Sequence, residues 1–317
     1  MSYGELIRDT FRITLRNRYL WFFGFFVGTT LPSGGGGGNL NRDDFEQSNA
    51  GLSTVAAQVA PGDFGGVAFV VGLVAVVALI LLFFVVMVVI SQGALSESVA
   101  AVDRGEERRF GSTFRSGLRN FWRVLGYYIL FFLIGLGLLV AIGVPVALLI
   151  GGTFVATESL GARVSVSVLA GLLGIVALIA VFIPFSVIGQ YALREVVVRG
   201  ERVVRSLGTG YGIFRGNVGR SLLLWLIHLG LMIGIGIAMV IVLLLVGLVL
   251  FIPTIVLAVS EYATAAVVTG IVAGLILLPL LLVASGAAGT FGHAFWTLAY
   301  LRLTGHREGP AQPGAVA

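Results

Sequence analysis

Residues 221–258 read SLLLWLIHLGLMIGIGIAMVIVLLLVGLVLFIPTIVLA, a run of 38 residues without Asp, Glu, Lys or Arg. As one straight helix it would be about 57 Å long, roughly twice the hydrocarbon thickness of a bilayer. A soluble fold of this size has no interior that could bury such a segment together with several others like it. The run therefore predicts a membrane-spanning helix and decides the class of the fold.

Other apolar runs of spanning length lie at 67–90, 121–151, 164–190 and 263–289. A sixth, YLWFFGFFVGTTLP at 19–32, is shorter. As a helix it reaches only ~21 Å, so an interfacial or re-entrant helix is the alternative for this segment. We expect an all-α integral membrane protein with six transmembrane helices.

The composition agrees with this class. Of 317 residues, 58% are hydrophobic and 11% are charged, and the mean hydropathy is +1.04. Soluble domains carry about 25% charged residues. There is no cysteine, and all 20 basic residues are arginine, which excludes disulfides, thiolate chemistry and Schiff-base lysines. The net charge of +5 favours contact with anionic lipid over nucleic-acid binding, so we expect no nucleic-acid partner.

The arginines predict the orientation of the chain. With six spans and a cytoplasmic N-terminus, 18 of the 20 arginines fall in cytoplasmic segments, and only Arg42 and Arg163 lie outside. This distribution follows the positive-inside rule. We expect a multi-pass protein of the bacterial plasma (inner) membrane, with both termini cytoplasmic and with the first apolar segment retained rather than cleaved as a signal peptide.

Short polar motifs recur along the chain. TFRITLRN at 10–17 matches TFRSGLRN at 113–120, and FRGN at 214–217 is a looser copy. QGALSESV at 92–99 matches QYALREVV at 190–197, with WTLAYLRLTG at 296–305 as a degenerate third copy. Leucine-rich composition cannot supply polar matches of this kind. We predict one membrane domain over 1–317, built as three repeated helical hairpins at about 1–105, 106–205 and 206–309, each with a cytoplasmic interfacial helix.

The interfacial helices carry the candidate lipid anchors. Residues 2–18 fit an amphipathic helix with apolar and arginine faces, typical of a helix in the headgroup plane; a docking surface for a partner is the alternative. Arginine can reach phosphate and tryptophan favours the membrane interface. The predicted anchors are Arg8, Arg12, Arg16, Arg119, Arg215, Trp21, Trp122, Trp225 and Trp296.

The repeated polar residues form a second candidate set: Asn17, Asn120, Asn217, Gln92, Gln190, Glu97 and Glu195. Asparagine can cap a helix where the chain turns into the membrane. We hypothesise that each glutamate pairs with an arginine of an Arg-Asn helix, as Glu97 would with Arg119, and so links consecutive units. A solvated helix exit is the alternative.

Apart from Arg123 at the entry of the predicted span 121–151, the predicted spans contain no Asp, Glu or Arg, and His228 is the ionisable residue well inside one of them. A lone histidine there is more typical of packing than of proton relay. Gly270 and Gly274 have the small-xxx-small spacing that predicts close helix packing. We expect residues 33–66 to form a Gly-rich external loop with a weak candidate cation site in its carboxylates, and residues 310–317 to form a disordered tail.

NRYLWFFGFF at 17–26 followed by five glycines resembles a group of uncharacterised bacterial polytopic membrane proteins. GYGIFRGN at 210–217 and the closing YLRLTGHREG at 300–309 resemble the membrane domain attached to some glycerophosphodiester phosphodiesterases. The resemblance implies an all-helical fold of six spans. It brings no activity, because the phosphodiesterase chemistry of those proteins belongs to a separate soluble barrel.

The residues favour a non-enzymatic protein, a scaffold or partner subunit of the membrane. The alternative is a permease or a lipid-handling transporter with a path between the three repeat units. The spans and their ends carry no clustered carboxylates, no metal-ligand spacing and no activated nucleophile in the sequence, so we expect no enzyme, cofactor or metal. The expected partners are anionic lipid headgroups on the cytoplasmic face and an unknown membrane protein.

Overall fold

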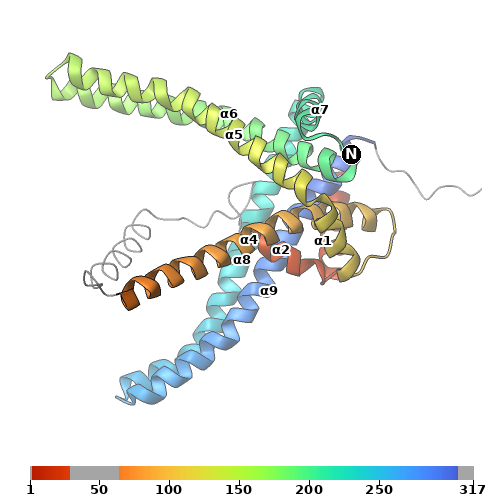
Figure 1. The fold of residues 1–317 in the computed structure, drawn as a ribbon, viewed down its shortest axis with the longest axis vertical. Coiled ribbons are helices and arrows are strands. Elements are labelled where there is room, and N and C mark those ends of the chain that lie inside the picture. Colours follow the sequence, from red (N-terminus) through yellow and green to blue (C-terminus); the bar gives the residue numbers. More distant parts are fainter. Residues whose placement is uncertain (1, 29–63, 306–317) are drawn as a thin grey trace, which may run out of the picture.

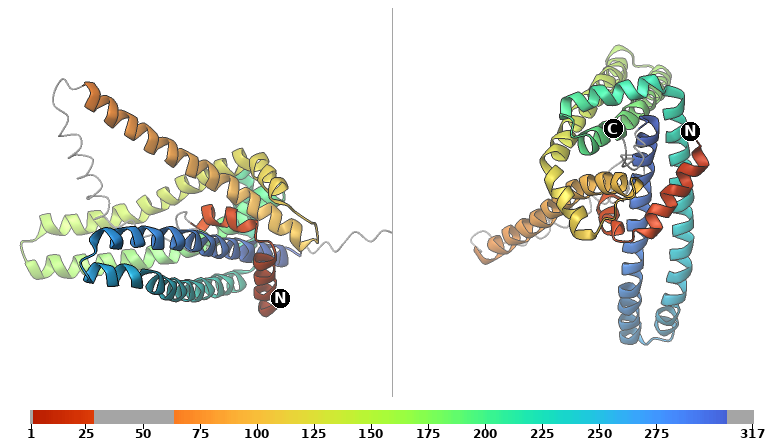
Figure 2. Two further views of the ribbon diagram at one scale, coloured as in Figure 1. Left: turned by 90° about the horizontal axis from the view of Figure 1, so that it is seen from below. Right: turned by 90° about the vertical axis from the view of Figure 1, so that its right-hand side faces the viewer.

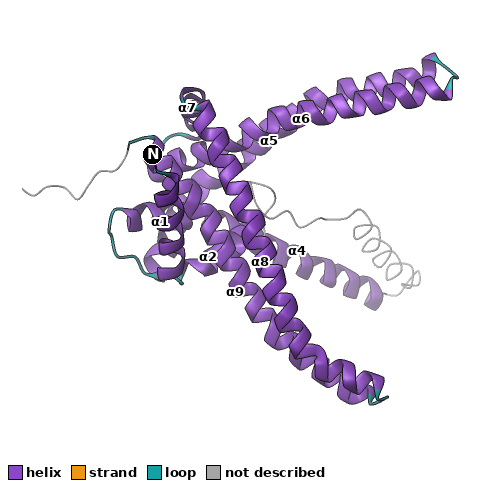
Figure 3. Cartoon of the chain, turned by 180° about the vertical axis from the view of Figure 1, so that it is seen from behind, coloured by secondary structure: helices purple, strands orange, loops and turns teal. Residues whose placement is uncertain are grey.

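A computed structural model describes residues 2–28 and 64–305 of the chain, and within them all regular structure is helical (Figure 3). The shorter helices are α1 (Tyr3–Arg16), α2 (Leu20–Gly28) and α7 (Val203–Gly216). The longer ones are α4 (Phe64–Asp103), α5 (Phe110–Ala156), α6 (Leu160–Val198), α8 (Val218–Val259) and α9 (Ala263–Leu303). The all-α class predicted from the sequence is confirmed.

Five of these helices, α4, α5, α6, α8 and α9, are long and apolar enough to cross a membrane. Helices suit such sequences because a bilayer offers no hydrogen-bond partners to the backbone, which an α-helix satisfies internally. The chain is therefore a multi-pass membrane protein by the length and composition of its helices. The segment predicted as a sixth span differs: α2 covers Leu20–Gly28, and residues 29–32 lie outside the described residues.

Three arms leave a common base (Figure 1). The arms are the outer half of α4, the α5–α6 hairpin and the α8–α9 hairpin, and their apolar side chains are largely exposed. The base consists of α1, α2, α7, the first turns of α5 and α8, and the last turns of α4, α6 and α9. In the left view of Figure 2 the two hairpins run in the same general direction from the base, whereas Figure 1 shows that they diverge.

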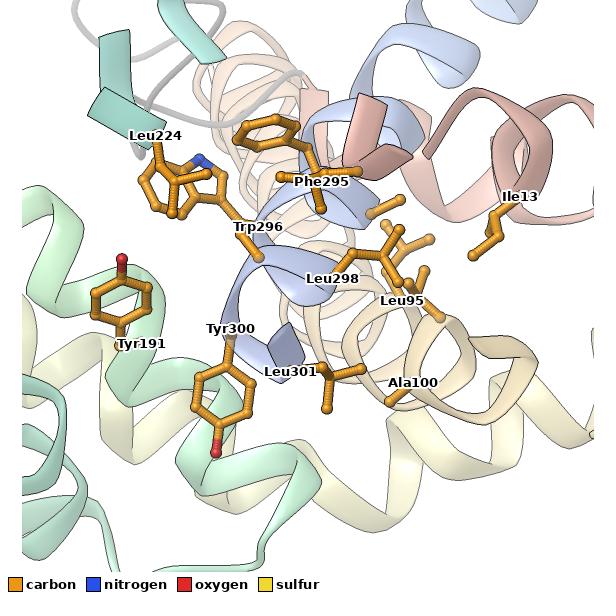
Figure 4. Close-up of a cluster of buried hydrophobic side chains, with 14 of the residues drawn as sticks. Ile13, Leu95, Ala100, Tyr191, Leu224, Phe295, Trp296, Leu298, Tyr300 and Leu301 are labelled. Atoms are coloured by element: carbon orange, nitrogen blue, oxygen red, sulfur yellow. The ribbon is translucent and has the colours of Figure 1, made fainter. Parts of the chain in front are cut away.

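The hydrophobic core lies in the base. The last turns of α4, α6 and α9 contribute Leu95, Tyr191 and Phe295, and α1 and α8 add Ile13 and Leu224 (Figure 4). The short helix α2 packs mainly against α9 and also against α4, with Leu20 and Phe23 fully buried. Its burial explains why the short aromatic segment at 19–28 is so apolar: it lies inside the base, between longer helices.

The three helices that return to the base end in the same way. α4, α6 and α9 each stop two residues before a glycine with positive φ, at Gly105 (85°), Gly200 (70°) and Gly305 (72°). Glycine adopts this conformation without the steric cost that a Cβ brings, and it commonly ends a helix by this means. The chain then turns sharply, into α5 after α4 and into α7 after α6.

Candidate functional site

The polar residues of the chain gather where the returning helices enter the base. α4 and α6 continue without a break beyond the predicted spans at 67–90 and 164–190, to Asp103 and Val198. The apolar helices therefore carry Glu97, Arg194 and Glu195 on their last turns, where they pack against one another and against α9. These ionisable side chains lie outside the predicted spans at 67–90 and 164–190, and the helices include them because they continue past the ends of the apolar runs.

Glu97 is the clearest link between consecutive hairpins. Its carboxylate accepts hydrogen bonds from Arg119 Nη2 at 2.6 Å and from Asn120 Nδ2 at 2.8 Å, both on α5. Arg108 lies at 3.8 Å from the same carboxylate. The predicted pairing of Glu97 with an arginine of the Arg-Asn helix is confirmed, and Asn120 joins it.

We expect Glu97 and Arg119 to show measurable but modest coupling. The side chain of Arg119 is 70% exposed, so water screens the pair and its contribution stays at about 1 kcal/mol or less. A double-mutant cycle with Glu97→Arg and Arg119→Glu, read from unfolding free energies in detergent, measures the coupling. Arg115→Glu is the control partner, because Arg115 is exposed on the same helix and has no ion pair to Glu97. Strict additivity in both cycles would contradict the link.

Glu195 is bound differently from the prediction. It is fully buried, ion-pairs with Arg199 at 3.4 Å on its own helix and accepts a hydrogen bond from Tyr300 Oη at 2.8 Å. The expected arginine of the next unit, Arg215, is exposed on α7. The correction has a physical reason: α9 packs against the last turns of α6, so the hydroxyl of Tyr300 reaches the carboxylate instead.

Arg194 is the residue that sequence reasoning missed. Its guanidinium is fully buried and donates to Gln190 through both the backbone oxygen, at 2.9 Å, and Oε1. On α9 it donates to Thr297 Oγ1 and His293 O, each at 3.4 Å. The signal was available in the repeat comparison, since Arg194 stands where the first copy has Ser96.

The two predicted glutamines are both buried in the base. Gln92 on α4 is 1% exposed, and Gln190 on α6 is buried and binds Arg194. His228 is buried as well, and its ring packs against Phe295 and Trp296. Within residues 2–28 and 64–305, no three His, Asp or Glu side chains come together as metal ligands could.

The three asparagines make the same local contact. The side-chain amide donates to the backbone oxygen four residues earlier: Asn17 to Ile13 at 3.0 Å, Asn120 to Ser116 at 3.1 Å and Asn217 to Ile213 at 3.4 Å. Asn17 and Asn217 follow the ends of α1 and α7, whereas Asn120 lies inside the continuous helix α5. Each asparagine therefore satisfies a carbonyl of the preceding turn, at a helix C-terminus in two of the three cases.

The predicted lipid anchors differ in how far their side chains are exposed. Arg8, Arg12, Arg16, Arg119 and Arg215 are exposed on the base, and the ring of Trp122 is 78% exposed. Trp21 and Trp225 are partly buried, and Trp21 Nε1 donates to Thr14 O at 2.8 Å. Trp296 is 2% exposed, so it is a core residue and not a lipid-facing anchor, because the other helices of the base surround this part of α9.

No curated protein and no solved structure matches the chain. One family model does match, over residues 19–304, which includes every long helix and the contacts of Glu97, Arg194 and Glu195 described above. Its description is a family of unknown function, DUF7544. Because the match covers most of its length, this polytopic membrane chain belongs to the DUF7544 family.

Proposed function

We propose that the protein is a non-enzymatic scaffold or partner subunit of a bacterial inner membrane. The observation that carries the proposal is the contrast between the base and the arms. Buried polar and apolar contacts join α1, α2, α4, α6 and α9 in the base, whereas the arms expose apolar side chains along most of their length. The apolar surface of the arms is compatible with contact to lipid acyl chains. The packed base offers a fixed surface to which a partner protein can bind.

Three contacts support the rigidity of the base. Arg302 of α9 ion-pairs with Asp9 of α1, and Thr290 Oγ1 of α9 donates to Leu20 O of α2 at 3.0 Å. Tyr300 of α9 donates to Glu195 of α6. Through these contacts the last helix of the chain holds elements from both of the other units.

The orientation belongs to the same proposal. The described arginines lie on the base, except Arg163, which is near the tip of the α5–α6 hairpin and donates to Thr157 O at 2.7 Å and Phe154 O at 2.9 Å. By the positive-inside rule the base then faces the cytoplasm, with both termini on that side. α1 and α7 would lie at the membrane surface as interfacial helices.

The threefold repeat is also proposed. Two local equivalences support it: the returning helices end two residues before Gly105, Gly200 and Gly305, and the asparagines of the three Arg-Asn motifs make the same backbone contact. In this interpretation each arm is one unit, and the units meet at their polar ends. The resemblance to membrane domains that accompany phosphodiesterases fits a role of this kind, in which the membrane part holds or positions another protein.

A lipid-handling transporter or permease is the second candidate, because the arms diverge from the base (Figure 1), and a path between the three units would run where they separate. Cryo-electron microscopy of the protein in lipid nanodiscs, with co-purifying material retained, separates the two. We expect a closed base, bilayer lipid around each arm, and any bound partner on the base. A continuous cavity that reaches the bilayer midplane and holds lipid or solute would instead establish the transporter.

A further inference from the structure

The start of α7 lies against the face of α5 that continues into the arm. A Cβ added at Gly126 of α5 would lie 3.8 Å from the side chain of Val203, the first residue of α7. A Cβ added at Gly200, in the turn before α7, would lie 3.2 Å from Nη1 of Arg123. The guanidinium of Arg123 therefore reaches the turn that carries Arg202. Two arginines from separate elements come to one place on the surface of the base.

The carboxylates near this place are engaged with other arginines. Glu195 ion-pairs with Arg199, and Glu201 ion-pairs with Arg205, each at 3.4 Å. α5 and α7 themselves contain no Asp or Glu. Within the described parts of the chain, no carboxylate pairs with either of the two arginines, and both of them are exposed. This place on the base therefore carries two positive charges without counter-charges, which is complementary to an anion.

Apolar side chains on the same face of α5 indicate which anion fits. Trp122 precedes Gly126 by four residues, so it shares that face, and it is 78% exposed. Ile129 and Leu133 follow Gly126 by three and seven residues and are 54% and 56% exposed. At the first turn of α7, Val204 is 75% exposed. The aromatic and charged side chains are thus followed along the helix by the apolar surface of an arm that is long enough to cross a membrane.

This combination favours a phospholipid over other anions. A guanidinium presents a planar set of donors that matches the oxygens of a phosphate group. Tryptophan favours the level of the headgroups, and the apolar face beyond it suits acyl chains. A soluble anion would leave that face uncovered. We propose that the α5–α7 surface, formed by Trp122, Arg123, Arg202 and Val204, binds an anionic phospholipid, with its phosphate at the two arginines and an acyl chain along the arm.

The proposal rests on the proposed position of the base at the membrane surface, and it names the lipid class that the base recognises there. The test is a titration of the delipidated full-length protein in detergent with phosphatidylglycerol, followed by native mass spectrometry. The variant is Arg123→Gln/Arg202→Gln. The control, Arg115→Gln/Arg215→Gln, removes the same charge from exposed positions about 12 and 20 Å further along the same two elements. Phosphatidylcholine with the same acyl chains is the neutral reference lipid.

We expect Arg123→Gln/Arg202→Gln to weaken phosphatidylglycerol binding by about tenfold or more, because charge-assisted hydrogen bonds to the phosphate are lost. The control should bind within about twofold of the wild type. Unchanged binding in the variant, or equal losses in variant and control, would overturn the site. Displacement of the lipid by equimolar glycerol 3-phosphate or by a glutamate-rich peptide would overturn the lipid assignment in favour of a soluble anion or an acidic protein segment.

Tryptophan fluorescence tests the same surface with both arginines in place, should the double variant unfold in detergent. Bromine atoms on an acyl chain quench a tryptophan that the chain contacts. We expect brominated phosphatidylglycerol to quench the wild type more than brominated phosphatidylcholine does, and Trp122→Phe to lose most of that difference, because Trp21 and Trp225 are partly buried and Trp296 is buried. An unchanged difference in Trp122→Phe would contradict the proposed position of the lipid.

The outcomes are distinct from those for the proposed function. A loss of this lipid site leaves the scaffold proposal standing. A transport cavity between the arms in nanodiscs would remove the scaffold proposal and leave the lipid titration intact.

Discussion

Gly24→Leu is expected to separate α2 from α9 and to lower the free energy of unfolding by about 3 kcal/mol or more. A Cβ at Gly24 would collide with the backbone oxygen of Gly286 and the hydroxyl of Thr290, and would lie 2.6 Å from the Thr290 nitrogen. Backbone atoms cannot move aside as a flexible side chain can, so the helices must shift. Thermal unfolding in nanodiscs, followed by tryptophan fluorescence, measures the loss.

The same substitution at Gly274 is the matched control. Gly274 lies on α9, in the arm, and a Cβ there would meet no atom within 4 Å. Leucine at this position faces open space that lipid can fill, so we expect the unfolding temperature of Gly274→Leu to stay close to that of the wild type. Equal destabilisation by the two substitutions would contradict the role of the α2–α9 contact, because leucine raises helix propensity at both positions and only Gly24 faces another helix closely.

These glycines also show where sequence reasoning is limited. The small-xxx-small pair Gly270 and Gly274 predicts close packing, yet only Gly270 has a near neighbour, the side chain of Thr254 at 3.3 Å. The closest approach involves Gly286 and Gly289, which meet α2. Spacing within one helix shows which residues share a face, but not which face another helix covers when that helix lies far away in the sequence.

The apolar runs predicted the long helices well, because chain length and hydropathy are local properties. α2 was harder to place: its aromatic sequence fits a short span as well as a buried helix, and only the packing on α9 distinguishes them. The apolar runs alone do not show where α4 and α6 end. Polar residues end an apolar run without ending the helix, since Glu97 and Glu195 find partners inside the base.

The candidate site was predicted in part for a similar reason. Glu97 and Arg119 belong to adjacent elements, so motifs that repeat together indicated their pairing. Glu195 instead meets Tyr300, and Arg194 meets Thr297, more than one hundred residues away. Such contacts depend on how the third hairpin packs against the second, and local pattern contains no information about it.

The second large effect on stability is expected at Arg194, whose charge is buried. It is fully buried, and within the described parts of the chain no carboxylate pairs with it; its hydrogen bonds go to neutral oxygens of Gln190, His293 and Thr297. Burying a charge without a counter-charge costs free energy that neutral hydrogen bonds only partly offset. The guanidinium therefore contributes mainly by filling space between α6 and α9.

Two substitutions separate the contribution of the Arg194 side-chain volume to stability from the contribution of its charge. Arg194→Ala leaves a cavity among packed helices, and we expect it to lower the free energy of unfolding by about 3 kcal/mol or more. Arg194→Met fills most of the same space without a charge, and we expect stability near or above that of the wild type. Thr297 keeps its own hydrogen bond to His293 O at 2.9 Å in both variants. Gln190 Oε1 loses the donor that Arg194 supplies in both variants, so this loss does not distinguish Arg194→Met from Arg194→Ala. Thermal and denaturant unfolding in the same detergent compare the three proteins.

The stability of Arg194→Met relative to Arg194→Ala decides what the charge does. If Arg194→Met loses as much stability as Arg194→Ala, the hydrogen bonds to Thr297 and His293 hold α6 against α9, and the charge is stabilising in place. If Arg194→Met is stable, the arginine is retained at a cost to folding. A cost of that kind is typical of residues kept for function, and the buried end of α6 would then become the first place to look for a partner's effect on the base.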